Sequence, residues 1–397
     1  MSLVAAAATR FSNRLGLGRH AWRVIRPLPP AWTPGWQRTA SDQAGWHAPP
    51  AGARRHVGPP TRARTPPPAP REENRAFSGM EVVFLGTGAG CGSATRSATS
   101  IALRIGGGQA PAVTYLFDTG DGTQRQLELS SKLVLHDVEN IFITHLHGDH
   151  VLGLPAVVCH LNESRKTSTS GLNIYGPRGL YNVLCATLSH TRAFLRVPVT
   201  VYELHDPKPE DHRHSRPRDG RRLPAAFRCK NLHRGDVWPD ADGFWTLRAD
   251  IGVTVRAARI KHRLKTYGYV VEERETNKYV MDPKRLAALG IPFSEERGLL
   301  ARGQAVTLSD GRVVQPSDVA FAKIGKGRKV AIVGDTNDPY DMAPLAQGAD
   351  VVIHEATLAN ERETMARANG HSTAGMAGKF ARSLNAAWLV LTHFSPR

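Results

Sequence analysis

The stretch Thr144-His145-Leu146-His147-Gly148-Asp149-His150 decides how this chain is interpreted. It begins at the end of an apolar run, residues 140–144, whose pattern is typical of a buried strand. Three histidines and an aspartate at HxHxDH spacing are far harder to explain as surface residues than two isolated histidines would be. Imidazole and carboxylate are ligands that zinc accepts, and Gly148 permits a sharp turn. The stretch therefore predicts a metal site at the end of a strand.

Other ligands are expected from distant parts of the chain, because one such cluster cannot complete two metal sites. His262 follows the apolar residues 253–260, Asp335 ends the run at 330–334, and His393 follows residues 389–391. Each therefore stands at a predicted strand end, as the first cluster does. The candidate metal ligands are His145, His147, Asp149, His150, His262, Asp335 and His393.

The pattern of apolar residues predicts an α/β sandwich. Strands are expected at residues 81–85, 100–105, 114–117, 140–144, 172–175, 199–204, 252–259, 268–272, 329–334, 351–354 and 388–392. Helices are expected at residues 122–129, 179–189, 342–347, 359–368 and 373–384. Two polar stretches, residues 206–242 and 281–318, are expected to be insertions, and the second should form a loop-rich arm. No apolar run reaches the roughly 18 residues of a membrane span, so no membrane partner is expected.

Positive charge is concentrated toward the amino terminus. The 397-residue chain has a formal net charge of +17, which favours a polyanionic partner. Residues 1–79 contribute +9, from twelve arginines against three acidic residues, and are rich in proline beyond residue 27. This composition predicts a disordered organellar transit peptide and Pro-rich linker, for the chloroplast or alternatively the mitochondrion. The other interpretation is a disordered extension that carries no targeting signal. The folded domain is expected to span residues 80–397.

Seven short motifs resemble a single family. They are FLGTG at 84–88, FDTGDGTQ at 117–124, THLHGDH at 144–150, GDT at 334–336, HEAT at 354–357, HST at 371–373 and LTHFSPR at 391–397. In this order, they are similar to ribonuclease Z, the tRNA 3′ endonuclease, of the metallo-β-lactamase superfamily. HxHxDH alone marks only the superfamily, whereas HEAT, HST and LTHFS are narrower. The resemblance implies an αββα sandwich with an inserted flexible arm.

The resemblance also assigns the candidate ligands to two zinc ions per subunit. His145, His147 and His262 would hold one ion. Asp149, His150 and His393 would hold the other, with Asp335 as the bridge. Asp149 would also orient or deprotonate the attacking water.

Further residues receive expected roles near this centre. The resemblance places His371 near the leaving group, where Glu355 would orient it; the alternative is a cap on the helix near residue 373. Asp118 is expected either behind a ligand histidine or in a structural turn. For His354, a structural hydrogen bond and a catalytic role are equally open.

A tRNA precursor would need phosphate contacts away from the cut. Candidates are Arg96, in the loop at 92–99, and the basic run at 323–329, which otherwise would be an exposed basic turn. Residues 281–318 resemble the arm that grips the tRNA elbow in this family. They depart from the family pattern where Phe293-Ser294-Glu295-Glu296 replaces its Gly-Pro pair.

The expected function is hydrolysis of the 3′ trailer of precursor tRNA, leaving a 3′ hydroxyl. The resemblance to the short form implies a homodimer in which each arm grips tRNA cleaved at the other subunit. Relatives continue beyond LTHFS, so the carboxyl end of the domain is expected to be truncated. Two alternatives remain open at this stage. One is a hydrolase of the same fold acting on a small phosphodiester or ester, and the other is an inactive RNA-binding homologue.

Overall fold

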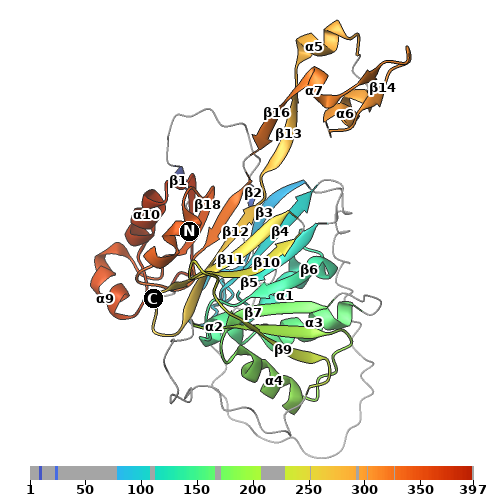
Figure 1. Ribbon diagram of the computed structural model, residues 1–397. Helices are drawn as coiled ribbons and strands as arrows, with labels where there is room; N and C mark the ends of the chain where they lie inside the picture. The colour runs from blue at the N-terminus through green and yellow to red at the C-terminus, as the bar shows by residue number, and fades with distance from the viewer. Residues whose placement is uncertain are drawn as a thin grey trace, which may run out of the picture.

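Two β-sheets packed face to face, with helices on both outer faces, form the body of the protein (Figure 1). The structure is a computed structural model, and it describes residues 9–10, 23–25, 78–107, 112–165, 171–206, 229–250, 252–291, 295–301, 303–325 and 327–395. The architecture is the αββα sandwich expected from the sequence.

The first sheet contains the amino-terminal half of the domain. Its strands lie in the order β2 (Arg23–Ile25), β3 (Ser78–Gly86), β4 (Ser100–Gly107), β5 (Val113–Phe117), β6 (Val138–Phe142), β7 (Leu172–Pro177), β8 (Val199–Leu204) and β9 (Leu232–Val237). From β5 to β9 all neighbours are parallel, so their carboxyl ends share one edge of the sheet. The outer face packs on α1 (Thr123–Leu129), α3 (Leu154–Ser164) and α4 (Leu180–His190).

The second sheet contains the later strands. Its order is β1 (Thr9–Arg10), β19 (Trp388–Thr392), β18 (Val351–Glu355), β17 (Lys329–Ile332), β12 (Thr266–Glu273), β11 (Val253–Ile260) and β10 (Trp245–Asp250). The 3-10 helix η2 (Tyr340–Met342), α8 (Ala343–Ala346) and α10 (Ala374–Ser383) pack on its outer face. Within the part of the chain that the structure describes, no helix is long and apolar enough to cross a bilayer.

Every strand and helix expected in the body coincides with an observed element. The helical residues predicted at 359–368 form η3 (Asn360–Arg362) and α9 (Glu363–Ala368). Elements that were not predicted include α3, β9 and β10. β9 lies within the polar insertion at 206–242, of which residues 207–228 lie outside the described residues.

Two short strands come from the segment expected to be a disordered leader. β1 pairs antiparallel with β19, and β2 pairs parallel with β3, so both extend sheet edges. Before Ser78, these two strands are the part of that segment that the structure describes. The other residues before Ser78 lie outside the described residues.

A ladder of aromatic rings lies between the sheets, close to the edge where the parallel strands end. The rings occupy paired positions on adjacent strands and belong to Phe117, Phe142, Tyr175 and Tyr202. Successive centroids are 5.0, 5.1 and 4.9 Å apart, in stacked geometry. Tyr269 of β12 tilts against Phe142 at 5.5 Å and donates a hydrogen bond from its hydroxyl to the Ile143 carbonyl at 2.6 Å. The two sheets are thus joined just below the HxHxDH segment.

The expected arm is a small folded lobe on a two-stranded stalk. The stalk pairs β13 (Thr276–Met281) with β16 (Ala320–Gly325). The lobe contains α5 (Pro283–Ala288), α6 (Glu295–Ala301), β14 (Val306–Thr307), β15 (Val313–Val314) and α7 (Pro316–Val319). Its own core includes Leu286, Ile291, Leu300 and Val319. The prediction of a loop-rich arm was therefore wrong, because these side chains are spaced to bury one another.

Truncation of the central ring should test the aromatic ladder. Phe142→Ala should lower the free energy of unfolding by about 3–5 kcal/mol, because a fully buried ring leaves a cavity between the sheets. Urea denaturation followed by circular dichroism measures this change. Leu129→Ala is the control, since Leu129 is 50% exposed at the end of α1. Equal effects of the two substitutions would contradict the role given to the ladder.

Candidate metal centre

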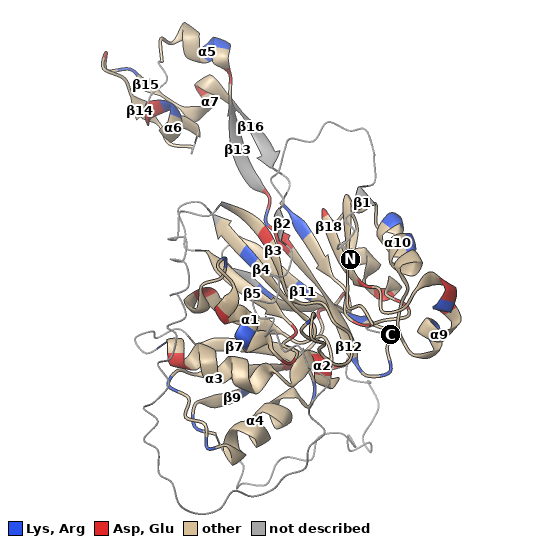
Figure 2. Cartoon of the chain, turned by 180° about the vertical axis from the view of Figure 1, so that it is seen from behind, with Lys and Arg blue, Asp and Glu red and all other residues tan. Residues whose placement is uncertain are grey.

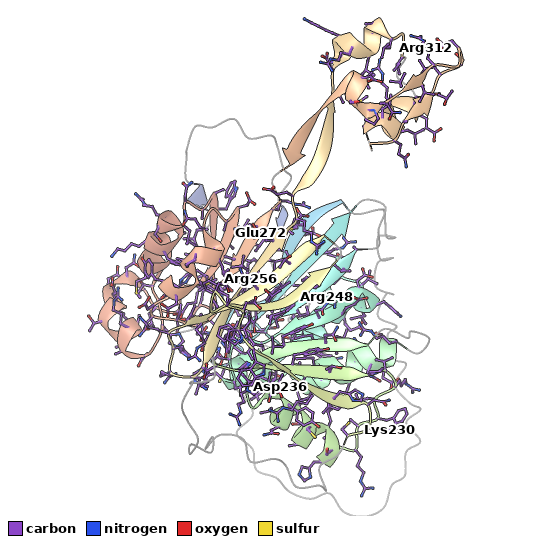
Figure 3. All side chains as sticks on the ribbon, in the orientation of Figure 1. Lys230, Asp236, Arg248, Arg256, Glu272 and Arg312 are labelled. Atoms are coloured by element: carbon purple, nitrogen blue, oxygen red, sulfur yellow. The ribbon has the colours of Figure 1, made fainter. Side chains whose placement is uncertain are left out.

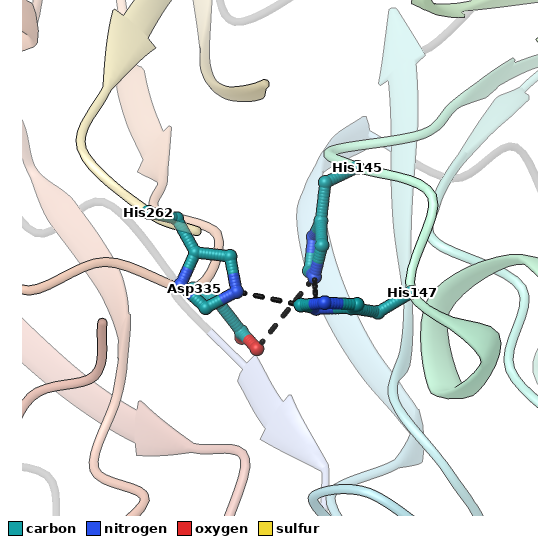
Figure 4. A group of neighbouring side chains, drawn as sticks. All are labelled: His145, His147, His262 and Asp335. Atoms are coloured by element: carbon teal, nitrogen blue, oxygen red, sulfur yellow. Dashed lines mark hydrogen bonds and ion pairs between the residues drawn. The ribbon is translucent and has the colours of Figure 1, made fainter. Parts of the chain in front are cut away.

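Four side chains from both sheets meet in a first group of potential metal ligands (Figure 4). His145 and His147 follow β6, His262 follows β11, and Asp335 follows β17. His147 Nδ1 lies 2.9 Å from His145 Nε2 and 3.2 Å from His262 Nε2. One donor atom from each of the four residues lies within 4.8 Å of the others. The sequence-predicted set His145, His147 and His262 is therefore brought together, with Asp335 beside it.

A second group adjoins the first. His150 Nε2 lies 3.2 Å from His393 Nε2, and His393 Nε2 lies 3.3 Å from Asp149 Oδ2. Asp335 reaches both groups, because its Oδ2 is 3.8 Å from His145 Nε2 and 3.4 Å from His150 Nε2. Its other oxygen is 3.4 Å from His393 Nε2. The position between two groups is the one that a bridging ligand requires.

In His145, His150 and His262, the ring nitrogen that faces away from the centre is held by a hydrogen bond. His150 Nδ1 donates to Asp118 Oδ2 at 2.7 Å, and His262 Nδ1 donates to the Gly370 carbonyl at 2.6 Å. His145 Nδ1 contacts the Thr144 hydroxyl at 3.0 Å, and that hydroxyl donates to Asp118. These contacts place the proton on the outer nitrogen and leave a lone pair on the inner one. Ligand histidines in metalloproteins are held in this way.

The spacing of the donor atoms suits zinc. Donor atoms held about 2.0–2.1 Å from one tetrahedral zinc ion stand about 3.3 Å apart. The separations of 3.2 Å from His147 to His262, 3.2 Å from His150 to His393 and 3.4 Å from His393 to Asp335 lie close to this value. Several inner nitrogens face one another at such distances, and a cation placed between them would be bound by several at once. The residues present therefore fit a divalent metal site.

Charge states in the first group also suit a cation. Burial lowers the pKa of His145 well below its usual value and lowers that of His147 and His262, so these rings are neutral. The Asp335 carboxyl is fully buried, which would raise its pKa. The charges of His393 and His150 nevertheless hold that pKa well below the usual range. The site thus offers neutral imidazoles beside an ionised carboxylate.

In the second group, a proton can occupy the ring nitrogen of one histidine that a cation would need. Burial would raise the pKa of Asp149, but its hydrogen bond with His393 and the charge of His150 lower it to about 2. Burial would lower the pKa of His150, but Asp335 and Asp118 raise it well above the usual value. A proton and a metal ion therefore compete for His150 when no ion is bound.

His371 lies beside the metal centre and is held by Glu355. His371 Nδ1 is 3.1 Å from Glu355 Oε1 and 3.7 Å from Asp335 Oδ2. Glu355 is fully buried, accepts a hydrogen bond from the Thr336 amide at 2.7 Å, and accepts another from the Thr357 hydroxyl. Burial lowers the pKa of His371, but the hydrogen bond and charge of Glu355 outweigh it and raise that pKa. Glu355 therefore contacts His371 from a buried position, which is the arrangement that orienting this ring would require.

The helix cap considered for His371 is supplied by another residue. Thr373 is the N-cap of α10, and its hydroxyl accepts a hydrogen bond from the Met376 amide at 3.3 Å. His371 is therefore available for a role at the metal centre.

The structure decides between the alternatives for two other residues. Asp118 accepts hydrogen bonds from His150, from the Thr144 amide and from the Thr144 hydroxyl, so it lies behind the HxHxDH segment and contacts both of its ends. His354 points to the opposite face of β18, where its ring meets Phe380 of α10 at 5.9 Å. Its Nδ1 donates to the Glu355 carbonyl at 2.8 Å. His354 is therefore a packing residue away from the metal centre.

The expected phosphate-binding residues have different contacts in the structure. The Arg96 guanidinium donates to the Thr87 hydroxyl at 2.7 Å and lies over the Phe394 ring, next to His393. In the basic run at 323–329, Arg328 is paired with Glu273, and Lys329 lies 3.0 Å from Glu272. The described members of that run are charge-compensated, which supports the basic-turn interpretation. The side chains of residues 321–326 lie outside the described part of the chain.

Sequence reasoning missed two supporting groups. The Thr357 hydroxyl lies 2.8 Å from His393 Nδ1 and also contacts Glu355, so it connects a ligand to the His371 pair. The Gly90 amide donates to Asp149 Oδ2 at 2.6 Å. Thr357 is the last residue of the HEAT motif, so its presence there was a usable signal. No local signal in the sequence indicates that Gly90 would approach Asp149.

The chain is similar to known proteins over most of its length. The family described as "Beta-lactamase superfamily domain" matches residues 295–394, and that described as "Anti-Pycsar protein Apyc1" matches residues 80–191. Zinc phosphodiesterase ELAC protein 1 of Mus musculus is 36% identical over 341 residues, covering 80% of this chain and 87% of that protein. Ribonuclease Z of Bacillus velezensis is 33% identical over 318 residues, covering 80% and 89%.

A solved structure shows the same relationship. The crystal structure of human tRNase Z, short form (ELAC1), is 30% identical to this chain, with a TM-score of 0.55. The match covers 80% of this chain and 93% of the human chain. The chain therefore belongs to the ribonuclease Z family of the metallo-β-lactamase superfamily.

Proposed function

We propose that this protein is a zinc-dependent endoribonuclease that removes the 3′ trailer from precursor tRNA and leaves a 3′ hydroxyl. The observation that carries the proposal is the convergence of two ligand groups on Asp335, with the His371–Glu355 pair beside them. Family membership supports tRNA as the substrate, because the solved human relative is a tRNase Z.

Two zinc ions per subunit would be held by the two groups. His145, His147 and His262 would bind one ion and Asp149, His150 and His393 the other, with Asp335 shared. When bound, such a pair of ions activates a water molecule and clamps the oxygens on either side of the phosphorus atom.

The chain's own residues supply the proton transfers. Water attacks phosphorus, and the bond between phosphorus and the tRNA 3′ oxygen breaks. Asp149, fixed by the Gly90 amide and His393, orients the water and accepts its proton. His371, oriented by Glu355, donates a proton to the departing 3′ oxygen. The phosphate stays on the trailer.

The arm is proposed to grip the tRNA away from the cut. Its charged residues are of both signs (Figure 2), and Arg312 is paired with Asp310 at 2.6 Å. Excess positive charge therefore does not support this role. What supports it is the lobe's extended position and its resemblance to the family arm.

A homodimer is proposed because the arm starts far from the metal centre of its own chain. β12 begins near His262 and ends at Glu273 beside the stalk, and its eight residues span about 25 Å. Figure 3 shows Glu272 near the arm root and Arg312 on the projecting lobe. An arm in this position can serve the site of a second subunit.

Residues 1–79 are proposed to act as a transit peptide for the chloroplast, with the mitochondrion as the alternative. The support is compositional: twelve arginines, three acidic residues and a proline-rich stretch. Residues 80–397 are proposed to form the nuclease domain, with residues 281–318 as its arm.

Loss of ligands should abolish zinc binding and cleavage together. His147→Ala and Asp149→Ala should lower cleavage of a 3′-extended precursor tRNA by more than about 100-fold, since each removes a ligand and not merely its support. Zinc content measured by mass spectrometry should fall in the same proteins. His233→Ala, an exposed histidine on β9, is the control. A zinc-loaded wild-type protein that cut only bis-p-nitrophenyl phosphate would favour the small-substrate hydrolase. Zinc-loaded protein that bound precursor without cutting either substrate would favour the inactive homologue.

Complementation between two inactive variants tests the arm and the dimer together. In the first variant, a short Gly-Ser turn replaces residues 276–325; the hydrogen bond from the Glu273 amide to the Arg328 carbonyl, at 2.9 Å, leaves the strand ends close enough to join. The second variant is His147→Ala. Each alone should fail on precursor tRNA. A co-expressed equal mixture should recover roughly a quarter of wild-type activity. Half of the dimers contain both variants, and in each of these one of the two sites is intact and is served by the arm of the other subunit. A mixture as inactive as its components would reject action between subunits.

A fluorescent reporter fused behind residues 1–79 tests the proposed transit peptide. We expect import into the chloroplast, or else the mitochondrion, seen by fluorescence microscopy. Replacing the twelve arginines of this segment with glutamine should abolish import, because such signals depend on their basic residues. Uniform cytosolic fluorescence of the unaltered fusion would reject the proposal.

A further inference from the structure

Arg263 is an unpaired cation at the edge of the metal centre. It directly follows the ligand candidate His262, and its side chain is exposed. Within the described part of the chain, no hydrogen bond or ion pair engages its guanidinium. An exposed arginine is often simply solvated, so its surroundings decide whether it has a role.

The neighbouring lysines of the same loop are each paired with a carboxylate. Lys261 Nζ lies 2.6 Å from Asp338 Oδ2, and Lys265 Nζ lies 2.5 Å from Asp206 Oδ2. Among these three cations, Arg263 is therefore the one that no described carboxylate pairs with.

A glycine turn fixes the stem of Arg263 beside His371. Gly370 has φ +77°, and a Cβ atom there would lie 2.7 Å from His262 Nδ1 and 3.3 Å from Arg263 Cγ. The Gly370 carbonyl also accepts the hydrogen bond from His262. Because His371 is the next residue, one turn positions the ligand His262, the stem of Arg263 and the proposed proton donor.

Ring contacts place the neighbour of Arg263 between two other histidines of the centre. The ring centroid of His262, the residue before Arg263, lies 5.0 Å from that of His147 and 5.0 Å from that of His371. Arg263 therefore follows directly on a ring that contacts both a ligand candidate and the proposed proton donor.

We propose that Arg263 is a catalytic residue whose guanidinium donates hydrogen bonds to a non-bridging oxygen of the scissile phosphate, on the His371 side of the metal centre. This inference rests on the proposed phosphodiester hydrolysis. As water attacks, negative charge grows on the phosphate oxygens until the bond to the 3′ oxygen breaks and His371 supplies its proton. A guanidinium beside the phosphate stabilises that charge, and its planar fork matches two phosphate oxygens or one oxygen twice.

Variants of Arg263 with a matched control test the proposal. Arg263→Ala and Arg263→Gln should lower kcat about 100-fold on precursor tRNA and on bis-p-nitrophenyl phosphate, since both contain the scissile group. Arg263→Lys should recover part of this loss. Lys261→Ala removes the same charge from the same loop and should stay within about 3-fold of wild type, since its ion pair with Asp338 is exposed. Zinc content and thermal melting of each protein verify that it is folded and loaded.

A binding measurement separates this proposal from the proposed function. The affinity of the zinc-loaded protein for inorganic phosphate, measured by calorimetry, should fall about 10-fold in Arg263→Ala, while precursor affinity should change less than about 3-fold because many other phosphates remain bound. A loss confined to precursor tRNA would overturn the proposal, because it would place Arg263 on a distant phosphate. A loss no larger than that of Lys261→Ala would also overturn it. If wild-type protein cut neither substrate, the proposed function would fail, and phosphate binding would still test Arg263.

Discussion

The metal centre depends on two hydrogen bonds that tie β12 to the chain just ahead of the first ligand. The Tyr269 hydroxyl donates to the Ile143 carbonyl at 2.6 Å, and the Tyr267 amide donates to the Thr144 carbonyl at 3.0 Å. Ligands come from both sheets, so a shift of one sheet against the other by a single residue would separate them. The stacked rings below these bonds resist such a shift, because each ring is enclosed by its neighbours.

Buried carboxylates orient the imidazole rings of the candidate metal centre. Asp118, Asp335 and Glu355 are each at most 3% exposed, and each contacts at least one imidazole. Burying a carboxylate is costly unless hydrogen bonds and opposite charge compensate it. Here Asp118 and Glu355 each accept several hydrogen bonds, so the rings that they hold have little freedom. A metal ion binding to rings already oriented in this way loses less entropy than one that must order them.

The sequence predicted the body and the convergence of the candidate ligands, because both follow from strand ends. When a parallel strand ends in a histidine or aspartate, that side chain lies at the edge of the sheet where the neighbouring parallel strands also end. Side-chain direction on β18 was also predictable in principle, since His354 and Glu355 must face opposite sides of a strand. The ion pair of Arg328 was not predictable, because its partner Glu273 lies 55 residues earlier, beyond the whole arm. The core of the arm was missed because its apolar residues are separated by polar turns, so no periodic run marked them.

The contact between His150 and His393 joins residues 243 positions apart and has a consequence for biosynthesis. A nascent chain emerging from the ribosome can assemble the first sheet and its helices early, since those residues are contiguous. The four residues of the first group are all present once residue 335 has emerged. The second group cannot exist until β19 has docked, because His393 follows that strand. Under the proposed two-ion arrangement, binding at the second group would therefore be a late event in maturation, and its occupancy would report that β19 has joined the second sheet.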